Sequence, residues 1–270
     1  MSLDDSLAAV AANQAGVRAW QEDLYRDLHA HPELSHQEHR TAGLVAERLR
    51  RSGFDVQEGI GGTGVVGVLR NGDGPGVLLR ADMDALPVTE ATGLPYASTV
   101  TGVAHSCGHD MHVTCLLGAA DLLAAGQSQW SGTLVAVFQP AEETVNGARG
   151  MVTDGLAGRI PAVDVALGQH VAPLPAGTLS TMSGPCFAAA DSIRITVYGK
   201  GGHASMPQTT IDPVVLAAGI VLKLQTIVSR ELEPGTPAVV TVGAVNAGTK
   251  ANIIPEHAEL LVNIRTYSDD

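Results

Sequence analysis

The chain has 270 residues, with 28 acidic and 16 basic side chains and a formal net charge of −12. Such an acidic protein repels the phosphates of nucleic acids and anionic lipids, so neither is an expected partner. No apolar run approaches the roughly 20 residues that cross a bilayer, and the acidic start MSLDDSLAAV lacks the pattern of a secretory signal. The three cysteines are too few for a disulfide scaffold, which favours a cytoplasmic location with reduced thiols.

The first two thirds of the chain alternate helical and strand-like stretches, as an α/β fold does. Ser35 and Glu38 have the spacing of a capping box and predict a helix that Gly53 ends. Apolar and β-branched runs then predict strands, and a repeat of helical period predicts a second helix. The predicted strands are 63–69, 76–80, 134–138 and 163–167, and the second helix is 110–125.

The connector APLPAG ends at Gly177 and indicates a domain boundary. We expect one domain over residues 1–176 and another over residues 177–270. In the second domain, Asp212 and Pro213 are typical of a helix start. The predicted strands there are 193–198, 239–245 and 260–265. This order is an α+β arrangement, and its sheet would need another helix to cover it.

The segment HSCGHDMH, residues 105–112, gathers the residue types that bind transition metals. Cys107 and His109 are separated by Gly108, which lets the backbone bend so that thiolate and imidazole face one point. The alternative is a polar helix start with solvated histidines. The density of ligand types favours a metal site. Cys115 and Cys186 are interpreted as small core residues.

Two consecutive carboxylates, Glu142 and Glu143, follow a predicted buried strand, at the sheet edge where α/β proteins build their sites. One can bind a metal while the other takes a proton from an activated water. Alone, the pair would be a solvated loop. His170 ends another strand, where a structural role is the alternative. Asp82 and Asp84 also end a strand and are suited either to orient a ligating imidazole or to cap a helix.

In order, the motifs RADMDALP, HSCGHDMH, FQPAEE, GQHV, GKGGHASMP and NIIP resemble those of the hippurate hydrolase and auxin-conjugate hydrolase group, relatives of the aminoacylases and carboxypeptidase G. The resemblance covers most of the chain. It implies a zinc-peptidase-like α/β/α catalytic domain with an inserted, ferredoxin-like α+β lid that mediates homodimerisation. It also implies metal-dependent hydrolysis of the amide bond of small N-acyl amino acids.

The resemblance implies roles for individual residues. It implies that Cys107 bridges two divalent metals, manganese or zinc, and that Glu142 is the general base. Coordination would be completed by His109, Glu143 and His170. In the lid, His203 matches a histidine that reaches across a dimer interface to stabilise the oxyanion. Asn252 and Arg265 match substrate-contacting positions, the arginine being suited to a carboxylate. The alternatives are a loop histidine and a solvated arginine.

Members of this group are longer, and after the lid they supply further strands and one last metal-binding histidine. The 270 residues contain no counterpart, so we expect a truncated copy or a fragment, with both domains incomplete, one weak metal site, low stability and weak activity. Two other functions stay open. The chain is a catalytically impaired dimerising or metal-binding module, or it is a deacetylase of N-acetylated diamino acids.

Overall fold

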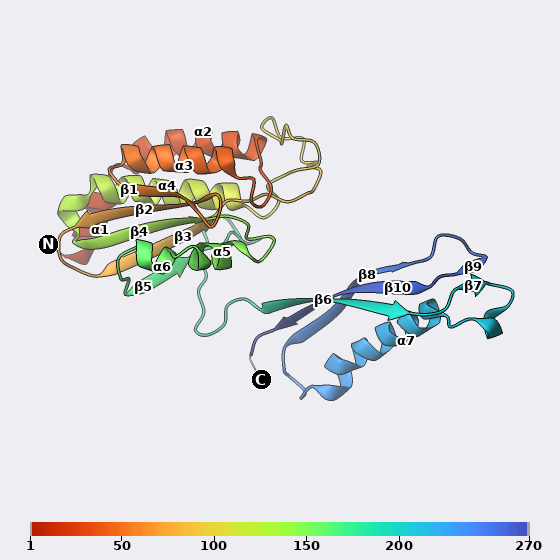
Figure 1. Ribbon diagram of the computed structural model, residues 1–270. Coiled ribbons are helices and arrows are strands. Elements are labelled where there is room, and N and C mark those ends of the chain that lie inside the picture. Colours follow the sequence, from red (N-terminus) through yellow and green to blue (C-terminus); the bar gives the residue numbers. More distant parts are fainter. Residues whose placement is uncertain (1, 269–270) are drawn as a thin grey trace. The chain divides into compact units, whose positions relative to one another are not determined.

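The computed structural model describes residues 2–268 and divides into two compact units, Met1–Leu174 and Pro175–Asp270, within the connector APLPAG (Figure 1). The described helices of unit 1 are α1 (Leu3–Ala11), α2 (Gln14–Ala30), α3 (His39–Arg51), α4 (His109–Ala125), α5 (Gly147–Thr153) and α6 (Leu156–Arg159), with a 3₁₀ turn η1 (Gln127–Gln129). Its strands are β1 (Asp55–Ile60), β2 (Gly64–Asn71), β3 (Gly76–Asp82), β4 (Gly132–Gln139) and β5 (Val165–Gly168).

The strands of unit 1 form one sheet in the order β1-β2-β4-β3-β5. β1, β2 and β4 pair antiparallel, whereas β4, β3 and β5 are parallel. The carboxyl ends of β3, β4 and β5 therefore meet at the same edge, which is where parallel sheets place their functional groups.

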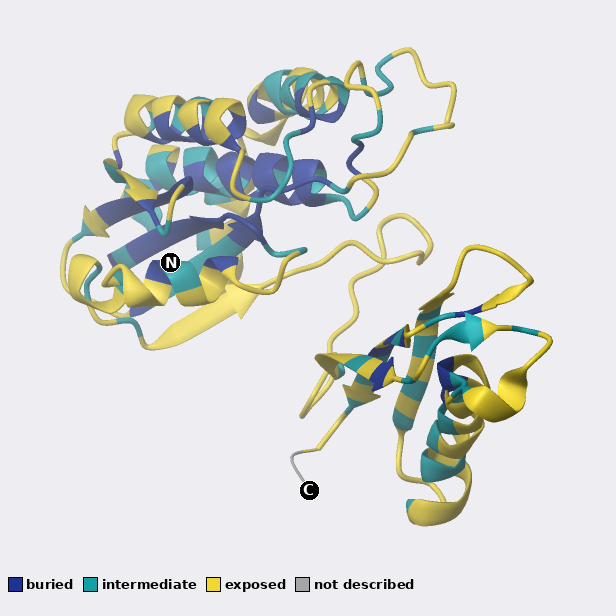
Figure 2. Ribbon diagram, turned by 45° about the vertical axis from the view of Figure 1, so that its right-hand side comes forward, coloured by how far each residue is buried: buried dark blue, intermediate teal, exposed yellow. Residues whose placement is uncertain are grey.

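Helices cover both faces of this sheet, as Figure 1 shows. Alternate residues of β2 face opposite ways. Val65 packs in the core beneath α2, α3 and α4, whereas Val66 packs with Met151 of α5 on the other face. Burial is concentrated in α4 and the central strands (Figure 2). The predicted α/β fold is confirmed.

The helix predicted to start with a capping box begins differently. α3 starts at His39, and the side chain of Ser35 donates a hydrogen bond to Asp84 (2.6 Å). The carboxylate of Glu33 accepts from the backbone N–H groups of Arg40 (2.9 Å) and Thr41 (2.8 Å) instead. The capping-box interpretation is therefore wrong: it rests on sequence spacing, and here the carboxylate that satisfies the first turn comes from before the motif.

Unit 2 contains the strands β6 (Ala189–Tyr198), β7 (Gly202–His203), β8 (Ala238–Ala247), β9 (Ile253–Ile254) and β10 (His257–Thr266), the helix α7 (Pro213–Thr226), a 3₁₀ turn η2 (Pro207–Thr209) and a π-helical turn η3 (Ile227–Glu231). An antiparallel sheet runs β6-β10-β8, and β7 pairs with β9. Asp212 caps α7 by accepting from the N–H of Val214 (2.8 Å). Ala217 of α7 packs against Leu260 of β10, so the helix covers one face of the sheet.

One other prediction is wrong, and the expectation that no stretch could span a membrane meets one exception by length and composition. The stretch Pro213–Glu231 has a mean hydropathy of 1.4 and, by length and composition alone, could cross a membrane. Its charged Lys223 and Arg230 conceal this from a search for an unbroken apolar run.

Cys186 is exposed rather than part of a core, because the segment before β6 packs against no apolar cluster of the described residues. Cys115 is half-buried.

Candidate metal centre

Four segments bring potential metal ligands to the edge where β3, β4 and β5 end. Asp84 follows β3, Glu142 and Glu143 follow β4, and His170 follows β5. α4 begins at the same edge with His109 as its first residue, preceded by Gly108 in the left-handed region (φ 86°). Glycine adopts this conformation without strain, which lets the chain turn sharply between Cys107 and His109.

The structure brings together Cys107, His109, Glu142, Glu143 and His170. One ligand atom from each of Cys107, His109 and His170 lies within 4.8 Å of the others, and so do those of His109, Glu142 and Glu143. The Sγ of Cys107 is 3.3 Å from the Nε2 of His170. The Nε2 of His109 lies 3.9 Å from an oxygen of Glu142 and 3.9 Å from one of Glu143. His109 thus belongs to both groups.

Two buried atoms of this cluster have no hydrogen-bond partner, the Nε2 of His109 and the Oε1 of Glu143. A buried polar atom without a partner costs roughly 1–3 kcal/mol. Both atoms are metal-ligand types, and a divalent cation between them would satisfy both. The donor set of thiolate, imidazole and carboxylate therefore fits a metal centre.

The electrostatics of the cluster also fit a cation. Burial, together with the charges of Glu143, Glu142 and Asp82, raises the pKa of the Cys107 thiol to about 12. Burial likewise raises the pKa of Glu143. Each shift reflects negative charge that is crowded and partly removed from water. A positive ion at this place would relieve both.

Asp84 is the polar hub of the centre. Its Oδ1 faces the Nδ1 of His109 (3.3 Å), and its two oxygens accept from the backbone N–H groups of Glu142 and Glu143 (3.0 Å each). Burial alone would raise its pKa, but these bonds and that from Ser35 lower the pKa to about 2. One ionised carboxylate therefore aims the free nitrogen of His109 and fixes both glutamates at once.

Glu38, which sequence reasoning assigned to a helix cap, supports the same turn. It is fully buried, accepts a hydrogen bond from the hydroxyl of Thr63 (2.6 Å) and accepts another from the N–H of Ala141 (2.8 Å). Ala141 has a φ of 48°, which costs an L-residue roughly 1–2 kcal/mol. Glu38 thus stabilises the strained residue that precedes Glu142. The sequence did not reveal this role, because the spacing of Ser35 and Glu38 is that of a capping box.

A second buried polar cluster holds the loop that precedes Cys107. His29 of α2 binds Asp110 of α4 (2.6 Å) and Glu90 of the loop (3.3 Å), and its ring lies 5.5 Å from that of Tyr96. Burial by itself would lower the pKa of His29, but the two carboxylates raise it. His29 therefore ties three segments together without belonging to the ligand cluster.

The remaining predicted site residues lie in unit 2, at two different places. His203 is exposed, its Nδ1 lies 2.8 Å from the hydroxyl of Ser205, and the carbonyl of Asn252 accepts from the N–H of Ala204 (3.1 Å). Arg265 is exposed and lies near the Thr266 end of β10, where it pairs with Ala190 of β6. Eight residues of strand separate it from the His257 end, roughly 26 Å at 3.3 Å per residue. His203 and Asn252 are together, and Arg265 is apart.

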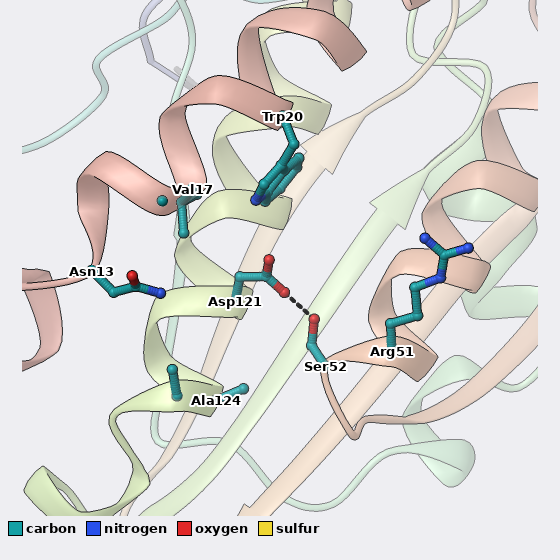
Figure 3. A pocket seen from close by; sticks show the side chains of 9 residues that line it. Asn13, Val17, Trp20, Arg51, Ser52, Asp121 and Ala124 are labelled. Carbon is teal, nitrogen blue, oxygen red and sulfur yellow. Dashed lines mark hydrogen bonds between the residues drawn. The ribbon is translucent and has the colours of Figure 1, made fainter.

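A separate open pocket of about 400 Å³ lies beside the C-terminal end of α4 (Figure 3). Asp121, which binds Ser52 there, is 12 residues beyond His109, roughly 18 Å along the helix. Trp20 lines the pocket, and the guanidinium of Arg48 lies 3.4 Å from the centre of its ring. Its lining contains no histidine or cysteine, so the pocket is not part of the metal centre.

Known proteins share both the sequence and the fold. Thermostable carboxypeptidase 1 of Saccharolobus solfataricus is 43% identical over 260 residues, which cover 94% of this chain and 65% of that protein. Hippurate hydrolase of Campylobacter jejuni is 43% identical over 251 residues, which cover 92% and 65%. The chain thus spans 65% of the length of these relatives.

The crystal structure of the Bacillus subtilis YXEP protein, a dinuclear metal-binding peptidase of the M20 family, has a TM-score of 0.75 and 35% identity, covering 94% of this chain and 66% of that one. A family model for the peptidase family M20/M25/M40 matches residues 78–263. That span holds all of the predicted site residues except Arg265, which lies just beyond it. The resemblance inferred from the motifs is confirmed, and the chain belongs to the peptidase family M20/M25/M40.

Proposed function

We propose that this protein hydrolyses the amide bond of small N-acyl amino acids at a centre of two divalent cations. The observation that carries the proposal is the meeting of Cys107, His109, Glu143 and His170, with the unpartnered Nε2 of His109 facing the unpartnered Oε1 of Glu143. Relatives named hippurate hydrolase and N-acetyl-L-cysteine deacetylase support this substrate class.

Cys107, His109, Glu143 and His170 would hold the cations, which when bound polarise the scissile carbonyl and lower the pKa of the attacking water. Glu142 is the group placed to move the proton. Its side chain is 40% exposed and adjoins the ligands, so its carboxylate can accept a proton from the water and donate it to the leaving amine. Thiolate and imidazole favour zinc, and carboxylate also suits manganese.

We propose that three residues of unit 2 also act on the substrate. His203 would donate a hydrogen bond to the developing oxyanion, with Asn252 beside it, and Arg265 would grip the substrate's carboxylate. We also propose a homodimer through unit 2. A cytoplasmic location stays a prediction.

The test is a panel of N-benzoyl, N-acetyl and N-indoleacetyl amino acids, with N-acetylated diamino acids included. Each is assayed after chelation and after addition of zinc or manganese. We expect metal-dependent release of the amino acid from at least one substrate. A chain that binds metal but cleaves none of them would contradict the proposed function, and a preference for the diamino acids would favour the deacetylase alternative.

A further inference from the structure

His112 is buried on α4 one turn after His109, and both of its ring nitrogens are hydrogen-bonded. Its Nδ1 lies 2.6 Å from the Oδ1 of Asp82, and its Nε2 accepts from the backbone N–H of Val171 at 2.9 Å. Because Nε2 accepts, the neutral ring carries its proton on Nδ1 and donates it to Asp82. The imidazole is a fixed link between β3 and the segment after β5.

The Asp82 end of this link is firmly anchored. Asp82 is completely buried, and its other oxygen accepts from the guanidinium of Arg80 at 2.8 Å. Arg80 in turn donates two hydrogen bonds to the side-chain oxygen of Gln139 at the end of β4 (3.0 and 2.8 Å). Groups on the neighbouring strands β3 and β4 therefore fix the position of His112.

Val171 makes three contacts, and one of them is with the proposed metal ligand His170. Besides the N–H bond to His112, the carbonyl of Val171 lies 2.7 Å from the Nδ1 of His170. The Val171 side chain packs on Gly108, where an added Cβ would come within 2.3 Å of it. With Nδ1 occupied by the carbonyl, the Nε2 of His170 is the nitrogen that faces Cys107 at 3.3 Å.

We propose that His112 is a positioning residue that latches Val171 and thereby sets His170 for metal binding. His170 lies on an exposed segment after the last strand of unit 1, so its place depends on such contacts rather than on burial. The essential feature is a hydrogen-bond acceptor at the position of Nε2. This inference rests on the metal centre of the proposed function.

Two substitutions separate the latch from general packing. In His112→Gln the amide oxygen can replace Nε2 as the acceptor for Val171, but the donor to Asp82 is lost. In His112→Asn the amide nitrogen can replace Nδ1 as the donor to Asp82, but the acceptor is lost. Each variant loses the ring and one hydrogen bond, so urea unfolding in chelator should show similar destabilisation of both.

Zinc affinity of the complete 270-residue chain, measured by calorimetry, is the deciding observation. Cobalt(II) absorption provides a second readout of the ligand set. We expect His112→Gln to bind zinc close to the level of the unaltered chain and His112→Asn to bind roughly 10–100-fold more weakly, as loss of a ligand-orienting contact typically does. Equal affinities of the two variants, whether retained or lost, would overturn the positioning role. If the unaltered chain binds no zinc, the proposed centre is wrong and the latch with it.

Discussion

At the scale of single residues, Cys107 combines a ligand atom with a thiol that resists ionisation. Its pKa of about 12 arises from burial and from Glu143, Glu142 and Asp82. Metals bind the thiolate, so a cation must displace the proton. This residue was predictable because cysteine, histidine and aspartate occur together within eight residues of sequence.

Zinc binding should therefore release about one proton from Cys107 near pH 7, and the affinity should rise with pH. Calorimetry in two buffers of different ionisation enthalpy measures the released protons. Cys107→Ser is the control, because a serine hydroxyl stays protonated, and it should reduce the release by about one proton. The same proton count in both proteins would mean that Cys107 is not a ligand.

Glu142 and Glu143 are adjacent residues with different proposed roles, Glu142 as the general base and Glu143 as a metal ligand. Glu142→Gln should lower the rate of hydrolysis by roughly 10²–10⁴-fold, because the amide cannot carry the proton, while zinc affinity changes little. Glu143→Gln is the matched control and should weaken zinc binding. The two variants are compared by turnover and by calorimetry. Loss of zinc affinity in Glu142→Gln would reverse the assignment.

At the scale of elements, the strands and helices that frame the centre were largely predictable, because apolar periodicity marks them. The predicted strand 134–138 lies within β4, and the predicted helix 110–125 matches α4 to one residue. β1 was not predicted, since DVQEGI is an edge strand with little apolar character. Tertiary partners such as Glu38 and Ala141 leave no periodic signal, which is why their contact could not be foreseen.

The turn between β4 and the glutamates depends on Glu38. Glu38→Ala should lower the free energy of unfolding by about 1–3 kcal/mol, because the buried N–H of Ala141 loses its acceptor. Glu38→Gln keeps one acceptor oxygen and should cost less. Urea unfolding of both variants measures the difference. Equal losses would show that the bond to Ala141 is not what stabilises the turn.

The cluster of His29, Asp110 and Glu90 predicts a pH dependence of stability. The pKa of His29 is raised in the folded chain, so its contribution to stability is complete below about pH 6.5, the unfolded value, and is lost as the pH rises through the folded value. The difference in unfolding free energy between the unaltered chain and His29→Gln should therefore shrink as the pH rises above about 6.5. Urea unfolding in chelator measures it, with exposed His31→Gln as the control. A difference that stays constant with pH would contradict this explanation.

At the scale of the whole molecule, the order of six short motifs predicted the family where composition alone could not. Composition and charge are shared by many acidic proteins, whereas the ligand types after β3, β4 and β5 are tied to one chemistry. The place of His203, Asn252 and Arg265 within unit 2 was beyond the sequence, because a motif does not state at which end of a strand it lies.

The outer face of α7 is apolar although the helix already covers its sheet. Val215 is 70% exposed and Leu222, two turns later on the same face, is 71% exposed. Apolar surface of this kind favours association. In the proposed homodimer, Leu222→Lys should shift sedimentation toward the monomer, whereas Asp73→Lys on a turn of unit 1 should not. An unaffected sedimentation profile would place the dimer contact elsewhere.

In the proposed function His203 and Arg265 act on the same substrate, and their separation along unit 2 then favours their being supplied by two different polypeptides. If one chain supplies Arg265 and the other His203, two inactive variants, His203→Ala and Arg265→Ala, repair each other when their dimers are mixed and exchanged. Half of the dimers are then hybrids with one intact site each, which restores about a quarter of the full turnover of a symmetric dimer. No recovery would mean that both side chains come from the same polypeptide.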